Sequence, residues 1–156
     1  MKVNLHRTIL ISFFLLTLQQ SYAQLKTYQF EQLDSLQKKE ARPVAIFIHT
    51  DWCKYCAAMI NTTFQNKEVI SHLNKHFYFI DFNAEEKRTI KIGHNTFKYK
   101  PSGNNTGIHE LAEQLALVNG KVSYPTLCFL NSNFEITYQH TQFINASDLL
   151  LVLSKL

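Results

Sequence analysis

The chain is poor in cysteine and has no apolar segment long enough to cross a membrane. Only three of its 156 residues are cysteine, which argues against a small domain held together by a framework of disulfides. A membrane-spanning helix needs about 20 apolar residues, whereas the apolar segment Ile9–Leu18 has ten. Basic residues form no block interleaved with aromatic residues, so nucleic-acid binding is not predicted.

The first 23 residues have the layout of a secretory signal peptide. Lys2 and Arg7 give a basic start, Ile9–Leu18 forms the apolar centre, and residues 21–23 read Ser-Tyr-Ala, a small-x-small cleavage site. No cysteine lies near this site, which argues against a lipid anchor. We therefore expect an exported protein, periplasmic or extracellular, that is soluble once the signal peptide is removed.

The remaining residues, 24–156, have the composition of one folded domain. The whole chain is 46% hydrophobic and 13% aromatic, which is enough for a single core. Removing Lys2 and Arg7 leaves 14 of the 16 basic residues against 12 acidic ones, a net charge of +2. An exported domain also works where disulfides persist.

Apolar periodicity predicts an α/β order of elements. Helical spacing predicts helices at 28–40, at 53–62, from Asn66 through Leu73, at 108–116 and after Asn145. Short apolar or alternating segments predict strands at 44–48, 77–82, 126–130 and 134–138. Residues 84–107 are less regular. Within them, 89–92 and 96–99 predict a small β-hairpin and 101–107 predict a loop.

Two of the three cysteines stand in the segment Trp52-Cys53-Lys54-Tyr55-Cys56, directly after the predicted strand 44–48. A strand leading into Cys-x-x-Cys, with a helix behind it, is typical of redox chemistry. A thiol normally ionises near pH 8.5, but a helix N-terminus and a nearby cation lower this to about 3.5–7.5. We therefore expect Cys53 to be the nucleophile, with Lys54 as the neighbouring charge, and Cys56 to be the resolving thiol.

A metal site is the main alternative for a Cys-x-x-Cys pair. Structural zinc needs four ligands, usually including a second close pair, and the rest of the chain offers only Cys128 and scattered histidines. Haem attachment would need histidine after the second cysteine, where Ala57 stands. We expect neither metal nor cofactor. Cys128, among apolar neighbours in a predicted strand, should behave as a small hydrophobic residue.

The order of elements, Trp52 before the cysteine pair, and Tyr124-Pro125 before a strand together resemble the thioredoxin superfamily. The resemblance spans residues 28–156. It is strongest to exported thioredoxin-like proteins with an Asp-Trp-Cys-x-x-Cys signature, such as the C-terminal domain of the membrane reductase DsbD. It implies a four-stranded mixed sheet flanked by helices, with 84–107 inserted as a β-hairpin region after the second main strand. It also implies a cis Pro125 against the disulfide, with Tyr124 and Trp52 beside the substrate.

The sequence departs from this family in two places. Many thioredoxins carry a buried aspartate six residues before the first cysteine, which helps the second cysteine lose its proton; Phe47 stands there. The dipeptide between the cysteines is Lys54-Tyr55, neither the Gly-Pro of cytosolic thioredoxins nor the Pro-His of strong oxidants. We therefore regard Lys54, Tyr55 and His49 as candidates for residues that tune the pair, with His49 as a candidate for proton transfer. Asp51 and Glu85 are weaker candidates for proton transfer, and a structural role for His49 stays open.

The resemblance implies an exported thiol–disulfide oxidoreductase. We favour a protein-disulfide reductase, because the dipeptide lacks the histidine of the strongest oxidants. Such a reductase would act, as a monomer, on cysteine-containing extracytoplasmic proteins and would need a membrane thiol reductase as its electron donor. Phe47 favours a second hypothesis, a client-binding module with incidental redox activity. Disulfide oxidase, isomerase and metal-chaperone functions remain further alternatives.

Overall fold

A computed structural model describes residues 24–156, and the predicted signal peptide lies outside this range. Four strands form one mixed sheet in the order β10-β9-β1-β2. These strands are β1 (Val44–His49), β2 (Tyr78–Asn83), β9 (Thr126–Leu130) and β10 (Ile136–His140). β1 runs parallel to β2 and antiparallel to β9, and β9 runs antiparallel to β10. The predicted four-stranded mixed sheet is confirmed.

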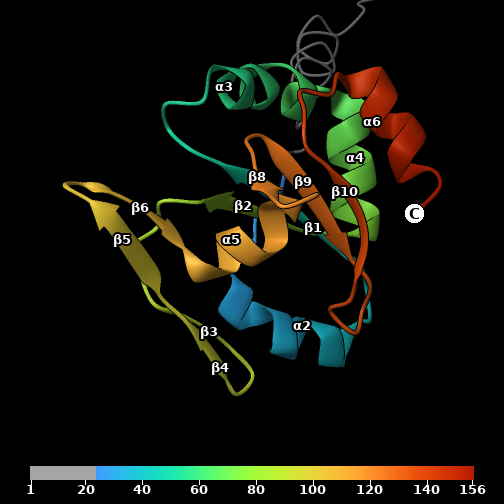
Figure 1. Ribbon diagram of the computed structural model, residues 1–156. Helices are drawn as coiled ribbons and strands as arrows, with labels where there is room; N and C mark the ends of the chain where they lie inside the picture. The colour runs from blue at the N-terminus through green and yellow to red at the C-terminus, as the bar shows by residue number, and fades with distance from the viewer. Residues whose placement is uncertain (1–23) are drawn as a thin grey trace, which may run out of the picture.

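The sheet separates two apolar clusters, because alternate residues of a strand point to opposite faces. On one face, Ala45 and Phe47 pack with α3 (Lys54–Asn61), α4 (Lys67–His76) and α6 (Ala146–Leu153). On the other face, Val44, Ile46 and Ile48 pack with η1 (Phe30–Gln32), α2 (Leu33–Lys39) and α5 (Glu110–Ala116). Figure 1 shows α3, α4 and α6 on the opposite side of the sheet from α2 and α5. No helix within residues 24–156 is long and apolar enough to cross a membrane.

Asparagine side chains define where two of these helices begin. A short η2 segment (Thr63–Gln65) separates α3 from α4, and the Asn66 side chain accepts the N–H groups of Glu68 and Val69 at 2.9 and 3.1 Å. The Asn145 side chain accepts the N–H of Asp148 at 2.9 Å. The predicted helix break and the cap at Asn66 are therefore confirmed.

The segment after β2 contains two hairpins rather than one. β3 (Ile90–Ile92) pairs with β4 (Asn95–Phe97), close to the predicted hairpin. The predicted loop at 101–107 is wrong, because β5 (Tyr99–Gly103) pairs with β6 (Thr106–His109). Pro101 is tolerated because a two-stranded ribbon leaves one side of each strand unpaired. At Gly107, opposite it, a Cβ atom would collide with the Tyr99 ring.

Near the end of the chain, one strand begins later than predicted and one short pair of strands was not predicted. The turn after β9 is held by the Asn131 side chain, which accepts the N–H groups of Asn133 and Glu135. It therefore runs through Phe134, which has a φ of 65°, and β10 begins at residue 136 rather than at the predicted 134. A short unpredicted pair, β7 (Leu117–Val118) with β8 (Lys121–Val122), follows α5.

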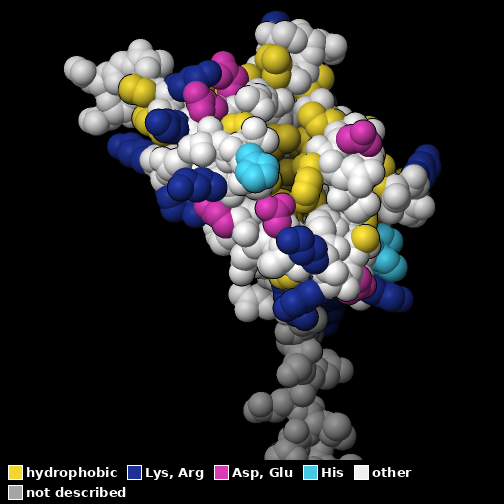
Figure 2. All heavy atoms as spheres, turned by 90° about the horizontal axis from the view of Figure 1, so that it is seen from below, with side chains coloured by type: hydrophobic (Ala, Val, Ile, Leu, Met, Phe, Trp, Pro, Cys, Tyr) yellow, Lys and Arg dark blue, Asp and Glu magenta, His cyan; other side chains and the backbone are white. Residues whose placement is uncertain are grey.

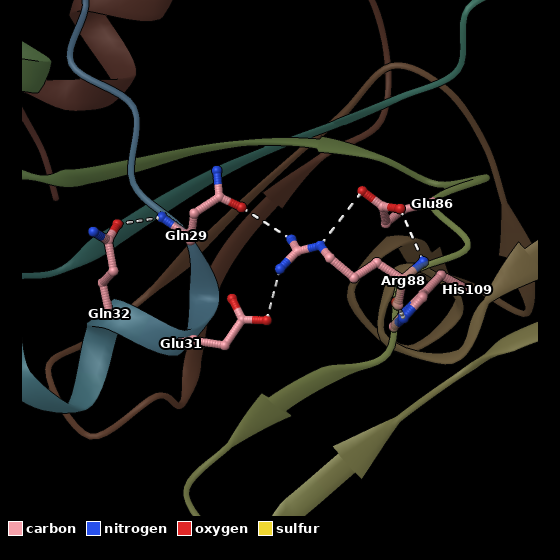
Figure 3. Close-up of polar contacts among 6 residues, drawn as sticks. All are labelled: Gln29, Glu31, Gln32, Glu86, Arg88 and His109. Atoms are coloured by element: carbon pink, nitrogen blue, oxygen red, sulfur yellow. Dashed lines mark hydrogen bonds and ion pairs between the residues drawn. The ribbon is translucent and has the colours of Figure 1, made fainter.

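Arg88 ties this inserted segment to the start of the domain, as Figure 3 shows. Its guanidinium donates to Glu31 at 2.8 Å and to Gln29 at 3.0 Å, and its carbonyl lies 3.1 Å from Nε2 of the buried His109. The other ring nitrogen of His109 accepts the N–H of Leu111 and so caps α5. Burial lowers the pKa of His109.

The face that carries α2 and the β3–β4 hairpin contains an apolar groove of 550 Å³, and Figure 2 shows this face with yellow apolar side chains in its centre. The groove lies between α2, α5, the hairpin and the turn before β10. The backbone N–H of Gly93 at the hairpin tip donates to Asp34 of α2 at 3.1 Å. This groove is across the sheet from the cluster that contains Cys53 and Cys56.

Candidate active site

Cys53 and Cys56 form a disulfide at the start of α3, with their Cα atoms 5.2 Å apart. Cys53 is the N-cap residue of this helix, and its sulfur accepts the backbone N–H of Cys56 at 3.1 Å. The first N–H groups of a helix have no partner within the helix and carry partial positive charge. The Cys53 sulfur therefore lies where a thiolate is stabilised.

The two cysteines differ in access to solvent. Cys53 keeps 7% of its surface exposed and Cys56 only 1%, and both belong to the apolar cluster beneath α3. Cys53 is therefore the more accessible cysteine of the pair, and Cys56 is almost fully enclosed by the cluster.

Hydrogen bonds fix the loop between β1 and α3 to the end of β2. The N–H of Cys53 donates to the Thr50 carbonyl at 3.2 Å, and the Asn83 side chain donates to Asp51 at 2.9 Å. The N–H of Ala84 donates to the His49 carbonyl at 2.7 Å. The cysteine pair is thus held at the edge of the sheet where the parallel strands β1 and β2 end.

Trp52 is exposed over 67% of its surface, yet its ring has two partners. The indole Nε1 donates to the Glu85 carboxylate at 3.1 Å. The ring also meets Tyr124 edge-on, with centroids 6.0 Å apart. Glu85, a candidate for proton transfer, therefore contacts Trp52, and these two contacts orient the Trp52 ring.

The peptide bond between Tyr124 and Pro125 is cis. Tyr124 packs against the apolar cluster that contains both cysteines, and Tyr124 and Pro125 line a depression together with Tyr55 of the Cys-x-x-Cys segment. Burial, followed by the charges of Glu85 and Glu113, raises the pKa of Tyr124 to about 12, so its phenol stays neutral at physiological pH. The backbone N–H and C=O of Tyr124 make no hydrogen bond within residues 24–156. They are therefore free to pair with a bound chain.

A depression of 410 Å³ adjoins this region, and its lining includes residues that sequence reasoning missed. Tyr55, Tyr124 and Pro125 form one part, and Thr141, Gln142 and Phe143 form the other. Residues 141–143 follow β10, and only the pairing of β10 with β9 brings them next to Pro125. No motif marks them in the sequence, so the fold was needed to find them.

Phe47 occupies the position where many thioredoxins bury an aspartate. It is 1% exposed, packs edge-on against Phe64 at 4.8 Å and belongs to the cluster that contains both cysteines. The neighbouring His49 stacks on Phe47 at 5.3 Å, and its Nε2 pairs with Asp81 at 3.0 Å. The hydrogen-bonding partner of His49 is thus a carboxylate on β2 and not a cysteine.

The remaining candidate residues differ in exposure. Lys54 is exposed, and Tyr55 is exposed over 66% of its surface. Cys128 is buried in β9, and burial raises its pKa to about 12. Within residues 24–156 no group of three or more histidine, cysteine or acidic side chains is arranged to hold a metal ion.

Comparison with known proteins gives the class of protein that this fold and site define. Residues 29–156 match the model of the thioredoxin-like domain family. Because this match covers most of the chain, the protein belongs to the thioredoxin-like family. No curated protein sequence matches it. The thioredoxin-like fold and the Cys53–Cys56 pair together support thiol–disulfide oxidoreductase activity.

Solved structures with the same fold include three redox proteins. A DsbH oxidoreductase is 19% identical, with a TM-score of 0.59, covering 88% of this chain and 91% of its own. A thioredoxin from Thermus thermophilus is 18% identical, with a TM-score of 0.58 and coverage of 84% and 85%. The reduced DsbD C-terminal domain from Neisseria meningitidis is 18% identical, with a TM-score of 0.51 and coverage of 79% and 89%. At these identities the similarity concerns the fold.

Proposed function

We propose that the protein is an exported protein-disulfide reductase that exchanges its Cys53–Cys56 pair with cysteines of extracytoplasmic proteins. The observation that carries this proposal is the position of Cys53. It caps α3, accepts the N–H of Cys56 and is the more exposed cysteine of the pair, and it follows Trp52, whose ring contacts Tyr124. A nucleophilic thiolate needs both the stabilisation and the access that this position supplies.

In the first step, the Cys53 thiolate of the reduced protein attacks one sulfur of a client disulfide. A Cys53–client disulfide forms, and the second client sulfur leaves as a thiolate that takes up a proton from water. In the second step, the Cys56 thiolate attacks the Cys53 sulfur and the first client sulfur leaves. The client gains two electrons and the protein is left with the Cys53–Cys56 disulfide. Phe47 supplies no proton acceptor for Cys56, so water is the acceptor in this account.

The client is expected to bind as an extended chain next to Tyr124. The unpaired backbone N–H and C=O of Tyr124 support this mode, because a client strand would pair with them. Such pairing reads the shape of the backbone rather than its sequence. Trp52, held by Glu85 and Tyr124, would cover one side of the bound chain.

A reductase that works outside the cytosol needs a source of electrons, and we propose a membrane thiol reductase in that role. Export is proposed from the signal-peptide pattern of residues 1–23. Protein recovered from outside the cytosol should then begin at Gln24, which N-terminal sequencing would establish. A secreted product that still begins at Met1 would contradict cleavage at this site.

Insulin reduction with dithiothreitol tests the enzyme hypothesis. The wild-type protein should accelerate precipitation of the insulin B chain, and the Cys53→Ser variant should not. Cys128→Ala is the matched control, because it removes the one cysteine outside the pair, and it should keep wild-type activity. Equal rates for the wild type and Cys53→Ser would sink the proposal.

The second candidate function is a client-binding module with incidental redox activity. Phe47, buried where an acid assists the second cysteine in many relatives, is the observation that favours it. Such a module would bind a reduced, unfolded client equally well with Cys53→Ser. Loss of client binding in that variant would favour the reductase instead.

A further inference from the structure

Two histidines lie one turn apart near the end of α4. His72 and His76 are four residues apart in this helix, and residues at this spacing are neighbours on the same side of a helix. Their ring centres are 4.7 Å apart, with the ring planes at 45°. His72 is half-buried and His76 is exposed. One side of α4 therefore carries two imidazole rings at close range.

The distance between the two rings suits the binding of both to one metal ion. Imidazole nitrogens bind zinc at about 2.0–2.1 Å, which places the centres of two rings on the same ion roughly 4.5–5.5 Å apart. The distance of 4.7 Å in α4 falls within this range. Two histidines at positions i and i+4 of a helix also supply zinc ligands in metalloproteases. The backbone of α4 therefore already has the spacing that a shared ion requires.

A hydrogen bond from a second helix fixes the state of the His72 ring. The ring is hydrogen-bonded to the backbone carbonyl of Leu153, the last residue of α6, and Figure 1 shows α6 packed beside α4. Because a carbonyl only accepts, a ring N–H of His72 donates this bond. In the neutral ring the other nitrogen then carries the lone pair that a metal ion needs. Metal-binding histidines are almost always held by such a bond on their second nitrogen.

Both rings are also available in the form that binds metal. Burial, followed by the charge of His76, lowers the pKa of His72 against the effect of its hydrogen bond to Leu153, which favours the neutral ring. The ring of His76 has no hydrogen-bond partner within residues 24–156. A nitrogen of each ring is therefore left for an ion.

We propose that His72 and His76 form a binding site for a divalent transition-metal ion, Cu²⁺, Ni²⁺ or Zn²⁺, the ions that imidazole ligands suit. Among residues 24–156 no third histidine, cysteine or acidic side chain joins the pair, so water completes the coordination. Structural zinc sites have four protein ligands, and a site with two exchanges its ion with solvent. The site lies on α4 and does not use the cysteine pair, so the inference does not depend on the proposed redox function.

Titration of the oxidised protein with Zn²⁺, without a polyhistidine tag, tests this site. The Cys53–Cys56 disulfide leaves no pair of thiolates for the ion, and Cys128 is buried. An ion that binds the folded chain stabilises it in proportion to the logarithm of the ion concentration once the site is filled. The midpoint of urea unfolding should therefore rise with Zn²⁺ and stay constant with Mg²⁺, which prefers oxygen ligands.

Variants of the two histidines separate this site from binding elsewhere. His72→Asn and His76→Asn should each weaken Zn²⁺ binding by at least about tenfold, because loss of a group that merely orients a ligand already costs about 10–100-fold. His94→Asn, which removes an exposed histidine at the tip of the β3–β4 hairpin, is the matched control and should bind Zn²⁺ as the wild type does. His76 is exposed, so His76→Asn tests the site even where His72→Asn fails to fold.

Electron paramagnetic resonance of bound Cu²⁺ gives a second measurement. The wild type should show coupling of the copper to two imidazole nitrogens, and His76→Asn should show coupling to one at most. A Zn²⁺-independent unfolding midpoint in the wild type would overturn the inference, because the two rings would then only stack. Equal Zn²⁺ affinity in the wild type and His76→Asn would overturn it as well.

Discussion

At the scale of single residues, the three cysteines occupy three different environments. Cys53 caps α3 and keeps 7% of its surface exposed, Cys56 keeps only 1%, and Cys128 is enclosed within β9 with no exposed surface. Reactivity of a thiol depends on the fraction present as thiolate and on access. Only Cys53 has both a stabilising N–H and a route to solvent.

Alkylation of the reduced, native protein tests this ranking. Because burial raises the pKa of Cys128 to about 12, that thiol should remain unmodified by iodoacetamide at pH 8. Cys53 should be labelled first. Mass spectrometry of peptides from briefly treated protein checks the order, and denatured protein, in which all three cysteines should react, is the control. Labelling of Cys128 at the rate of Cys53 would contradict the enclosed position.

Glu85 illustrates a positioning role that the fold supplies. Replacing Glu85 by Ala should release the indole N–H of Trp52 and make the ring more mobile. Because Trp52 is the only tryptophan in the chain, a fall in fluorescence anisotropy and stronger quenching by acrylamide would report this directly. Glu86→Ala, which removes the neighbouring carboxylate beside Arg88, should leave both signals unchanged. The prediction fails if the two variants behave alike.

At the scale of elements, His109 joins the inserted hairpins to α5. Its two ring nitrogens have different partners, the Arg88 carbonyl and the N–H of Leu111. The second contact requires a neutral ring, because a protonated nitrogen cannot accept a hydrogen bond. Burial lowers the pKa of His109, against opposing effects of the hydrogen bond to Arg88 and the charges of Glu110 and Glu86.

This lowered pKa predicts the direction of a pH effect on stability. Above about pH 6.5, the usual pKa of histidine, the ring is neutral in the folded and unfolded states and its contribution is fully present. As the pH falls from there towards the lower pKa of the folded state, the unfolded state binds the proton first and stability is lost. His109→Asn keeps a capping side chain that does not titrate, so urea unfolding at pH 7, 6 and 5 should show a smaller loss than in the wild type.

The control for this effect is His94→Asn, which replaces an exposed histidine at the tip of the β3–β4 hairpin. It should lose as much stability between pH 7 and pH 5 as the wild type. A wild-type curve that is matched by His109→Asn would mean that other groups cause the pH dependence.

The elements that were predicted correctly are those with a strong local signal. Val44–Ile48 is apolar on both faces. The helix starts at Cys53 and Asn66 are predicted from the residues that immediately surround them. The two errors arise from side-chain contacts that apolar periodicity does not predict. The hairpin at 99–109 depends on the Tyr99 ring lying against Gly107, and β10 begins late because the Asn131 side chain extends the preceding turn.

In the candidate site, too, the residues with a strong local signal could be predicted and those brought in by the fold could not. The spacing of Cys53 and Cys56 predicts a redox pair, and the resemblance to thioredoxins singles out Trp52 and Tyr124. Phe143 lies 18 residues after Pro125 in a stretch without a motif. Only the register of β9 with β10 brings it to the depression that Tyr55 and Pro125 also line. The hydrogen bond between Trp52 and Glu85 likewise depends on the path of the inserted segment where it follows β2.

At the scale of the whole molecule, the sheet divides the core into two clusters with different roles. One cluster contains Ile90, Leu111 and the helices below the sheet, and the other contains both cysteines of the pair together with Met59. The inserted hairpins complete the first cluster. The redox chemistry belongs to the second.

A pair of cavity-forming variants tests this division. Ile90→Ala, at a fully buried position, should lower the free energy of unfolding by about 2–5 kcal/mol and leave the reduction potential of the cysteine pair unchanged. Met59→Ala should lower stability by a similar amount and shift the potential as well. Urea unfolding and glutathione titration measure the two quantities. An equal shift of potential in both variants would contradict the division.

We propose that Cys53–Cys56 is the reversible disulfide of a reductase. Its most direct test is the reduction potential of the wild-type protein, measured by equilibrating it with glutathione buffers and following the fraction oxidised. For a reductase we expect a potential near that of thioredoxin, roughly −270 to −230 mV. A value near −120 mV, typical of a strong oxidant, or a disulfide that does not exchange with glutathione at all, would contradict it.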